Sequence, residues 1–327
     1  MNAPQSVANS TQRTGIVAIV GRPNVGKSTL LNHLIGEKLA AVTPKAQTTR
    51  KRFRGIRSEP GIQMIFLDTP GVHVPPKGKA LNEYIVSEAL SGLEDADLVI
   101  YLLDGTREFR ATDPKSDEGY LLSALKAKLE KRRVPLLVLL NKSDLWSKGE
   151  GSFGNQAMLA GILDELPVTA FLPISAKNGR GVEELLKLIK ENLPEGPALF
   201  PEDELTDQSV RTIAGEMIQE QLFFQLGQEL PYSCCVEVVR YSDPKEGKRL
   251  PEIEARIHVE RDSQKPMVIG RGGQKLKAIG IRARESIQRV VGEKVVLKLQ
   301  VTVTADWTKN RGRLESLGYT LPAETRL

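Results

Sequence analysis

The chain has 327 residues and a formal net charge of +5, with a composition typical of a globular protein. A chain of this length exceeds one typical hydrophobic core and favours two domains. Its longest apolar runs, such as residues 135–140, are too short to cross a bilayer, which excludes helical membrane spans. Residues 1–13 are polar and lack the apolar core of a signal peptide, so we expect a disordered N-terminal extension there.

The basic charge is concentrated near the C-terminus. Residues 265–313 contain 12 Lys and Arg against 3 Asp and Glu. A basic excess confined to one part of a chain is typical of a nucleic-acid-binding surface. The two cysteines, Cys234 and Cys235, are adjacent, and adjacent strand residues point to opposite faces, so they form a poor disulfide pair. This cysteine usage fits the reducing cytoplasm.

Short apolar runs alternate with longer amphipathic segments in the first part of the chain. The runs are residues 16–20, 62–67, 98–103, 136–140 and 168–174, and helical patterns between them include 117–133 and 181–192. This alternation predicts an α/β domain over residues 14–193, with a mostly parallel sheet and helices on both faces. Residues 194–207 contain three prolines and five acidic residues, which predicts a linker.

The pattern changes after the linker. We expect a helix at about 208–230, strands at 234–241 and 252–260, a helix at 272–291 and a strand at 295–304. Apolar and polar residues alternate over 253–260, so that strand has one buried and one solvent-facing side. Residues 208–327 are therefore predicted to form a separate α+β domain.

A phosphate-binding motif follows the first predicted strand. Its residues are Gly21, Arg22, Pro23, Asn24, Val25, Gly26, Lys27 and Ser28, and a helical segment comes next. This spacing matches the P-loop, in which backbone N–H groups surround a phosphate, the lysine reaches the β- and γ-phosphates and the serine hydroxyl is a Mg²⁺ ligand. The first domain is therefore predicted to bind a nucleoside triphosphate with Mg²⁺.

Three further motifs stand at the ends of later strands. They are Asp68, Thr69, Pro70 and Gly71; then Asn141, Lys142, Ser143 and Asp144; and last Ser175, Ala176 and Lys177. The Asp68 carboxylate can hold Mg²⁺ through its hydration shell. The Asp144 carboxylate can accept hydrogen bonds from guanine N1–H and the exocyclic amine, both of which adenine lacks, so it predicts a strong preference for GTP. A backbone amide of the last motif can contact guanine O6.

Together these motifs resemble the translation-factor-related small GTPases over residues 15–193. The resemblance implies a switch threonine that binds Mg²⁺, for which Thr49 is the candidate and Thr48 the alternative. It places the catalytic groups at Lys27, Thr49 and Gly71. Where Ras-like proteins carry the catalytic glutamine this chain has Val72, and an apolar side chain cannot orient water. We therefore expect slow intrinsic GTP hydrolysis.

Two residues near these motifs have alternative interpretations. His73 replaces the missing glutamine, or it is a solvated loop residue. Asn24 resembles the asparagine with which related GTPases bind a potassium ion beside the phosphates, or it only shapes the loop.

A G-x-x-G step stands before the basic helix of the second domain. The candidate RNA-binding residues there are Gly270, Arg271, Gly272, Gly273, Lys275, Lys277 and Arg282. Glycines allow a sugar-phosphate backbone to approach closely, and the arginine can meet a phosphate. The segment resembles the loop of a type II KH domain, which binds about four unpaired nucleotides.

An α/β P-loop GTPase domain followed by an α+β type II KH domain, with the closing segment 306–310, resembles the bacterial Era GTPase family over nearly the whole chain. The resemblance implies GTP and GDP as ligands, binding of single-stranded 16S rRNA near its 3′ end and a role in maturation of the small ribosomal subunit. It also implies a cytoplasmic location with peripheral contact with the cell membrane, and we expect a monomer. Two alternatives remain open: a nucleotide site that only stabilises an RNA-binding protein, and a membrane-attached signalling switch.

Overall fold

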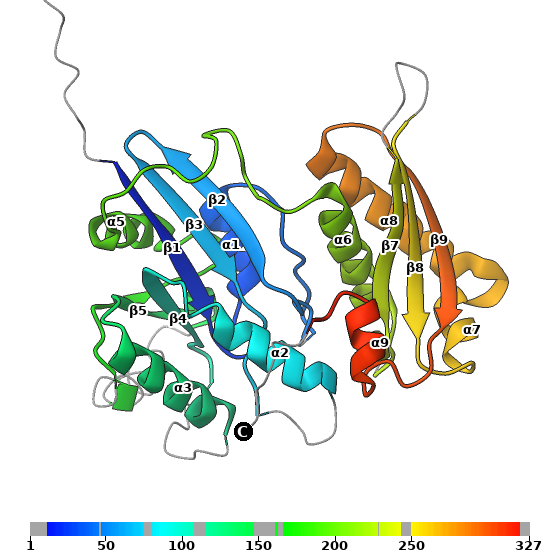
Figure 1. The fold of residues 1–327 in the computed structure, drawn as a ribbon, viewed down its shortest axis with the longest axis horizontal. Coiled ribbons are helices and arrows are strands. Elements are labelled where there is room, and N and C mark those ends of the chain that lie inside the picture. The colour runs from blue at the N-terminus through cyan, green and yellow to red at the C-terminus, as the bar shows by residue number, and fades with distance from the viewer. Residues whose placement is uncertain are drawn as a thin grey trace, which may run out of the picture.

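Two β-sheets organise the computed structural model, which describes residues 12–45, 47–74, 80–107, 116–146, 161–162, 166–227, 229–242 and 250–320 (Figure 1). The larger sheet has six strands in the order β2-β3-β1-β4-β5-β6. Its strands are β1 (Arg13–Val20), β2 (Phe53–Glu59), β3 (Ile62–Asp68), β4 (Leu98–Asp104), β5 (Leu136–Asn141) and β6 (Ala170–Pro173). All neighbours are parallel except β2, which runs antiparallel to β3.

Successive residues of the central strands face two different helical layers. The helices of this part are α1 (Lys27–Ile35), α2 (Ala80–Ser91), α3 (Asp117–Lys131) and α5 (Val182–Asn192). Val17 and Ile19 belong to the hydrophobic cluster with α1 and α5, whereas Ala18 and Val20 belong to the cluster with α2 and α3. Because both faces are covered, the inner strands are continuous apolar runs. The predicted mostly parallel sheet with helices on both faces is confirmed.

The edges of this sheet differ from the sequence prediction. β1 begins at Arg13, which pairs with Ile62, so the predicted extension 1–13 is wrong at its C-terminal end. Residues 1–11 lie outside the described residues. β2 was not predicted, because its half-buried edge residues give no continuous apolar run. The predicted strand 168–174 is shorter and spans Ala170–Pro173.

Residues 194–207 form a strap along the edge of the larger sheet. The Gln63 side chain accepts hydrogen bonds from the N–H groups of Leu199 and Phe200 (2.8 and 2.9 Å) and donates to the Phe200 carbonyl (2.8 Å). The Ile56 N–H donates to the Leu205 carbonyl (2.8 Å), so the strap also covers β2. An edge strand covered in this way is not free to pair with another chain. The segment predicted as a linker is therefore fixed to the sheet.

The smaller sheet has three strands in the order β7-β8-β9, with β8 antiparallel to β7 and parallel to β9. The elements of this part are α6 (Val210–Gln225), η2 (Leu230–Ser233), β7 (Cys235–Ser242), β8 (Glu252–Val259), α7 (Gln264–Ile269), η3 (Arg271–Gly273), α8 (Gln274–Val291), β9 (Val296–Val303) and α9 (Arg311–Ser316). Helices α6 and α8 pack against each other over the apolar face of this sheet. We call residues 210–320 the KH module.

The predicted order of elements in the KH module is confirmed, with two corrections. The helix expected at 208–230 ends at Gln225, and a short 3₁₀ helix follows. The helix expected to start at residue 272 starts at Gln274, and a separate helix, α7, precedes the G-x-x-G step. The break comes at Gly270, whose φ of 76° no helix interior permits. None of the described helices is long and apolar enough to cross a membrane.

The two domains share a hydrophobic contact that the sequence did not predict. Trp307 is fully buried and stacks on Tyr319 with 6.0 Å between ring centroids, and Tyr84 of α2 packs edge-on against Tyr319 at 5.3 Å. The Leu81 N–H donates to the Thr308 carbonyl (3.0 Å). Figure 1 shows α2 and α9 side by side at this junction. The helix that follows the Asp68 motif is thus packed against the KH module.

Candidate functional site

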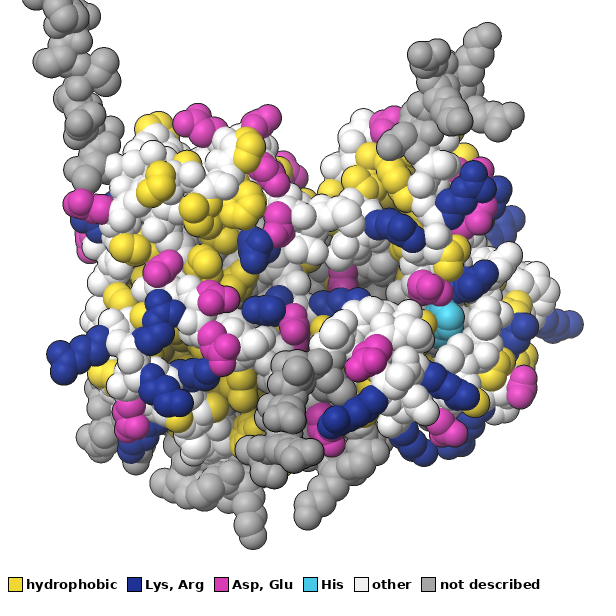
Figure 2. Space-filling view, in the orientation of Figure 1, with side chains coloured by type: hydrophobic (Ala, Val, Ile, Leu, Met, Phe, Trp, Pro, Cys, Tyr) yellow, Lys and Arg dark blue, Asp and Glu magenta, His cyan; other side chains and the backbone are white. Residues whose placement is uncertain are grey.

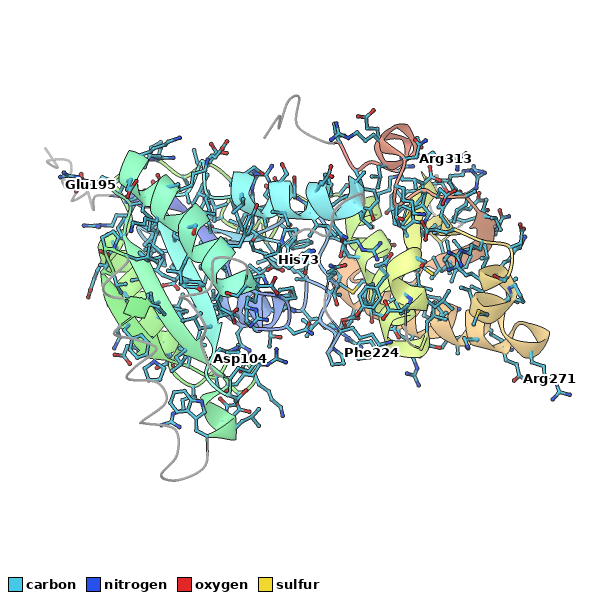
Figure 3. All side chains as sticks on the ribbon, turned by 90° about the horizontal axis from the view of Figure 1, so that it is seen from below. His73, Asp104, Glu195, Phe224, Arg271 and Arg313 are labelled. Atoms are coloured by element: carbon cyan, nitrogen blue, oxygen red, sulfur yellow. The ribbon has the colours of Figure 1, made fainter. Side chains whose placement is uncertain are left out.

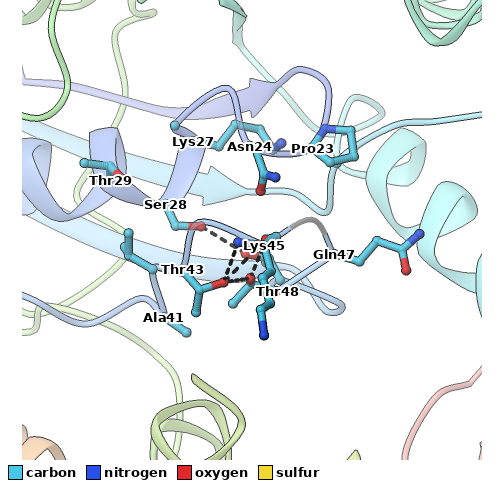
Figure 4. Close-up of a pocket in the computed structure, with 14 residues that line it drawn as sticks. Pro23, Asn24, Lys27, Ser28, Thr29, Ala41, Thr43, Lys45, Gln47 and Thr48 are labelled. Carbon is cyan, nitrogen blue, oxygen red and sulfur yellow. Dashed lines mark hydrogen bonds between the residues drawn. The ribbon is translucent and has the colours of Figure 1, made fainter. Parts of the chain in front are cut away.

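The P-loop joins β1 to α1 and forms one wall of the pocket in Figure 4. Asn24 and Gly26 have positive φ angles of 63° and 105°, a conformation that turns successive N–H groups toward one side and favours an anion there. A Cβ at Gly26 would lie 2.3 Å from the Asn141 amide nitrogen, so only glycine fits. The loop therefore has the shape of a phosphate cradle.

A buried ammonium and a buried carboxylate lie beneath this cradle. Lys27 Nζ donates to the carbonyls of Gly21 and Arg22 (3.1 and 2.8 Å). Burial lowers the pKa of Lys27 to about 8, against the opposing charge of Asp68. Burial also raises the pKa of Asp68 to about 6, opposed by Lys27 and by two hydroxyl groups. Desolvation of these two charged groups is only partly offset by their protein contacts. The pocket therefore favours a ligand whose phosphates pair with Lys27 and whose bound cation pairs with Asp68.

The three predicted Mg²⁺ ligands meet at one point. The Ser28 hydroxyl donates to Asp68 Oδ2 (2.5 Å) and lies 2.9 Å from Thr49 Oγ1, which is 3.5 Å from the same carboxylate oxygen. The other carboxylate oxygen, Oδ1, is buried and has no hydrogen-bond partner among the described residues. Two hydroxyls and a carboxylate are the oxygen donors that Mg²⁺ prefers. These residues therefore fit a magnesium ion.

The Thr48 hydroxyl bonds within its own loop, whereas the Thr49 hydroxyl contacts Ser28 and Asp68. Thr48 Oγ1 is 2.5 Å from Thr43 Oγ1 and donates to the Lys45 carbonyl (3.0 Å). Figure 4 shows this group of contacts in the loop that faces the P-loop. The geometry thus favours Thr49 over Thr48 as the candidate metal ligand.

The segment after β3 packs closely on the P-loop. The Thr69 hydroxyl donates to the β1 backbone (2.8 Å), and the Val72 N–H donates to the Gly21 carbonyl (3.1 Å). A Cβ at Gly71 would lie 2.6 Å from the backbone of Pro23. Gly71 is therefore placed where its own backbone can approach a phosphate held by the P-loop.

Val72 and His73 are both buried, so neither has the surroundings of an exposed loop residue. His73 Nε2 lies 3.2 Å from Gln47 Nε2, and its Nδ1 lies 3.3 Å from the Gly71 carbonyl oxygen. Figure 3 shows His73 in the middle of the molecule, between the two domains. The histidine thus links the loop before Thr49 to the loop after β3, and the solvated interpretation of His73 does not hold.

The guanine-reading motif is tied to both neighbouring loops. Asn141 Nδ2 donates to the Val25 carbonyl (2.6 Å), and Asn141 Oδ1 accepts from the Ala176 N–H (2.8 Å). Asp144 Oδ1 accepts from the Ser175 hydroxyl (2.6 Å), while the rest of this aspartate is exposed. The carboxylate is therefore oriented by a hydrogen bond and accessible to a base.

The other residues of these motifs hold the loop after β5 against β4 and β6. Lys142 Nζ bonds to Asp104 Oδ2 (2.7 Å), and the Ser143 N–H donates to the Ile174 carbonyl (3.1 Å). Although burial opposes it, hydrogen bonds from Lys142 and Thr106 hold the pKa of Asp104 below its usual value. Asp104 ends β4 and was not among the predicted site residues. Lys177 is exposed, whereas Ser175 and Ala176 contact Asp144 and Asn141.

The Arg22 side chain contacts α3 and does not line the pocket of Figure 4. It forms ion pairs with Glu118 and with Asp117 (3.5 Å to the latter) at the start of α3. Asp117 also accepts a hydrogen bond from the Val74 N–H (2.8 Å). Arg22 thus contributes its backbone to the P-loop, and its side chain fastens that loop to α3.

A second candidate site is a groove between α8 and β9 of the KH module. The groove has a volume of about 440 Å³ and is lined by Gly273, Leu276, Lys277, Gly280, Ile281, Arg284, Leu297 and Leu299. Arg271 lies in the G-x-x-G step at one end of the molecule, well away from His73 and Asp104 (Figure 3). Leu276, Leu297 and Leu299 are half-buried and form its floor, whereas Lys277 and Arg284 are exposed and form its rim. Such a surface suits unpaired bases and their phosphates.

Not every predicted RNA-binding residue lines this groove. Lys275 Nζ donates to the Met267 carbonyl (3.2 Å), which fastens α8 to α7. Arg282 is exposed but lies outside the groove lining, whereas Arg284 belongs to it. Figure 2 shows Lys and Arg side chains along the edge of the KH module that faces away from the first domain. The basic surface therefore extends beyond the groove.

The apolar floor of the groove was not predicted from the sequence. Leu297 and Leu299 alternate with polar residues in β9, a pattern that is also typical of a strand with one buried face. The signal that could have located the groove is Gly280, a glycine inside a helix, because a Cβ there would lie 3.4 Å from Leu299 and narrow the groove.

The fold and the two sites define a P-loop GTPase with an attached KH domain. Residues 16–142 match the family model described as 50S ribosome-binding GTPase, and residues 229–308 match the KH domain model. GTPase Era from Geobacter sp. (strain M21) is 42% identical over 313 residues, which covers 94% of this chain and 98% of that protein. The chain therefore belongs to the Era family of GTPases.

Further relatives agree over the same length. GTPase Era from Pseudomonas fluorescens is 40% identical over 311 residues, or 95% of this chain and 98% of that protein. A crystal structure of Era in complex with MgGDPNP and nucleotides 1506–1542 of 16S ribosomal RNA superposes with a TM-score of 0.86 at 36% identity, covering 95% of this chain and all of that one. An Aquifex aeolicus Era variant bound to GDP and AlF4⁻ gives a TM-score of 0.85, also at 36% identity and with the same coverage.

Proposed function

We propose that this chain is a GTP-controlled switch that binds single-stranded 16S rRNA near its 3′ end and assists maturation of the small ribosomal subunit. The observation that carries the RNA part is the groove beside the G-x-x-G step, with its apolar floor and its rim of Lys277 and Arg284. The related Era structure solved with nucleotides 1506–1542 of 16S ribosomal RNA supports the same class of RNA for this chain.

In this proposal GTP and GDP bind in the pocket of Figure 4. Backbone N–H groups of residues 21–28 and the Lys27 ammonium bind the phosphates, and Asp144 reads the guanine. Ser28, Thr49 and Asp68 would hold Mg²⁺, which when bound neutralises charge on the β- and γ-phosphates. The Gly71 N–H approaches the γ-phosphate and thereby senses whether it is present.

Hydrolysis would depend on groups that stabilise charge. Val72 occupies the position of the water-orienting glutamine of Ras-like proteins, and its buried apolar side chain cannot bind water. The Lys27 ammonium and the P-loop N–H groups stabilise the charge that develops on the phosphate oxygens. Asn24 lines the same pocket and is the residue that we propose for a potassium ion beside the phosphates. This set of groups favours slow turnover, which suits a timer.

Control by GTP would act through the loop that carries Thr49. Lys38 Nζ and the Val42 N–H both bond to the fully buried Glu220 of α6 (3.1 and 2.9 Å). Lys45 Nζ donates to the Leu226 carbonyl (2.5 Å). A γ-phosphate that orders this loop therefore acts on a segment already bound to the KH module.

Cytoplasmic action as a monomer, with peripheral contact with the membrane, completes the proposal. Anionic lipid and RNA both attract basic surfaces, so they are distinguished by experiment. The competing function, a membrane-attached switch, predicts that vesicles bind more tightly than RNA.

Binding to a single-stranded oligonucleotide with the sequence of the 16S rRNA 3′ end tests this proposal. With a GTP analogue and Mg²⁺ present, we expect it to bind at least about tenfold more tightly than the same sequence paired with its complement, because the groove has room for unpaired bases only. Fluorescence anisotropy measures both affinities, and vesicles with anionic lipid are the third ligand. Equal affinity for the duplex, or tighter binding to vesicles, would refute the proposed RNA function.

A further inference from the structure

The Arg50 guanidinium is buried inside the KH module although its backbone belongs to the GTPase domain. Only 3% of Arg50 is exposed. Its Nη1 donates to the Cys234 carbonyl (2.7 Å), and its Nη2 donates to the carbonyls of Pro231 and Tyr232 (3.2 and 3.3 Å). Pro231 and Tyr232 belong to η2, and Cys234 joins η2 to β7.

The surroundings of this guanidinium are built to hold it. Each carbonyl oxygen has two lone pairs, so the carbonyl groups at the end of η2 can accept a further hydrogen bond, and the planar guanidinium can donate to several of them at once. The charge also lies over the rings of Phe223 and Trp307, 5.6 and 5.8 Å from their centroids. Contacts of this kind stabilise a cation that has left water. Arg50 is therefore a fixed anchor between the two domains.

This anchor is the next residue after Thr49. Adjacent Cα atoms lie about 3.8 Å apart, so Thr49 cannot keep its place if the backbone of Arg50 moves. The next residue is held by the KH module as well, because Lys51 Nζ lies 4.7 Å from the centroid of the Tyr319 ring. The contact of Thr49 with the Ser28 hydroxyl thus depends on chain geometry that the KH module fixes.

We propose that Arg50 is a positioning residue for GTP hydrolysis: through its guanidinium the KH module holds Thr49 at the Mg²⁺ site. The inference rests on the proposed role of Thr49 as a metal ligand in the GTP state. The coupling is reciprocal. If the KH module stabilises the GTP-bound position of Thr49, then GTP binding stabilises the contact between Arg50 and the KH module. The G-x-x-G step lies far from the pocket, so any effect of GTP on that step passes through the body of the KH module (Figure 3).

A double-mutant cycle of Arg50→Lys with Thr49→Ala tests the inference. The measured quantity is the ratio of affinities for a non-hydrolysable GTP analogue and for GDP, both with Mg²⁺, together with the single-turnover hydrolysis rate. The switch threonine acts only when the γ-phosphate is present, so we expect Thr49→Ala to lower the ratio about tenfold. Arg50→Lys keeps the charge but loses the fork, and we expect a fall of about three- to tenfold. The double variant should match Thr49→Ala alone.

The control is Arg54→Lys, the same change in an arginine that pairs with Asp207 of the strap and makes no contact with Thr49. It should leave the ratio within about twofold of the wild type, as distant surface changes do. If Arg50→Lys does not fold, Phe223→Leu takes its place in the cycle, because it removes one ring from the guanidinium and leaves Arg50 intact. The melting temperature of each variant is recorded alongside.

The outcomes separate the inference from the function on which it rests. If Arg50→Lys lowers the melting temperature and leaves the affinity ratio unchanged, Arg50 is only a structural anchor and the inference is wrong. If the effects of Arg50→Lys and Thr49→Ala multiply, the two residues act independently and the inference is equally wrong. If Thr49→Ala itself leaves the ratio unchanged, the proposed role of Thr49 fails first.

Discussion

The Asp144→Asn variant is expected to lose most of its affinity for GTP and to gain affinity for xanthosine triphosphate. Guanine presents two donors, N1–H and the exocyclic amine, and the carboxylate accepts both. An asparagine turns its own NH₂ group toward the amine, which leaves a polar group unpaired, and we expect about a thousandfold loss. Xanthine carries a carbonyl oxygen in place of the amine, so the amide regains an acceptor.

Competition against a fluorescent GDP derivative measures both affinities. The matched control is Asp203→Asn, the same change at an exposed position on the strap, which we expect to stay within about twofold of the wild type. Asp144 is already oriented by the Ser175 hydroxyl at 2.6 Å, and asparagine can accept the same bond, so the loop should keep its shape. GTP affinity that survives the change at residue 144 would show that another group reads the base.

The Gly272→Asp variant is expected to lose RNA binding while keeping its nucleotide site. Gly272 is exposed, has a φ of 58° and has open space where a side chain would be added, so the substitution places a negative charge in the G-x-x-G step without a steric clash. A charge of the wrong sign where a phosphate is expected should weaken RNA binding by about tenfold or more. GTP hydrolysis without RNA should be unchanged, because the loop lies far from the pocket.

Two controls isolate the charge. Gly272→Asn imposes the same backbone conformation without the charge, and asparagine tolerates positive φ. Gly292→Asp adds the same charge at the other end of α8, at a glycine with a φ of 78° and open space around it. Both should bind RNA nearly as the wild type does. If Gly272→Asp binds RNA as tightly as the wild type, the KH groove is not the RNA-binding site.

The nucleotide motifs were predictable because each stands at the end of an apolar strand, and parallel strands bring those ends together. The order of the P-loop, Asp68 and Asp144 along the chain therefore predicted a nucleotide site at this edge of the sheet. The choice between Thr48 and Thr49 was not predictable, since the two are chemically identical and only the backbone decides which faces Asp68. The burial of His73 was not predictable either, because it depends on a contact with Gln47 from another loop.

The contacts between the two domains could not be predicted from the sequence. Arg50 and Cys234 are 184 residues apart, and nothing local to either predicts their contact. A strand such as β2, half-buried at an edge, and a helix such as α7, of only six residues, give weak periodic signals. The strap 194–207 has the composition of a free linker, and its attachment depends on contacts with residues distant in sequence, such as Gln63 and Ile56.

The affinity of the wild-type protein for the single-stranded 16S rRNA 3′ fragment, measured once with Mg²⁺ and GDP and once with Mg²⁺ and a non-hydrolysable GTP analogue, tests nucleotide-controlled RNA binding most directly. Coupling between two sites of one protein is typically about 5- to 150-fold, and we expect tighter binding with the analogue within that range. Equal affinities in the two nucleotide states would contradict the account, because the pocket and the groove would then act independently.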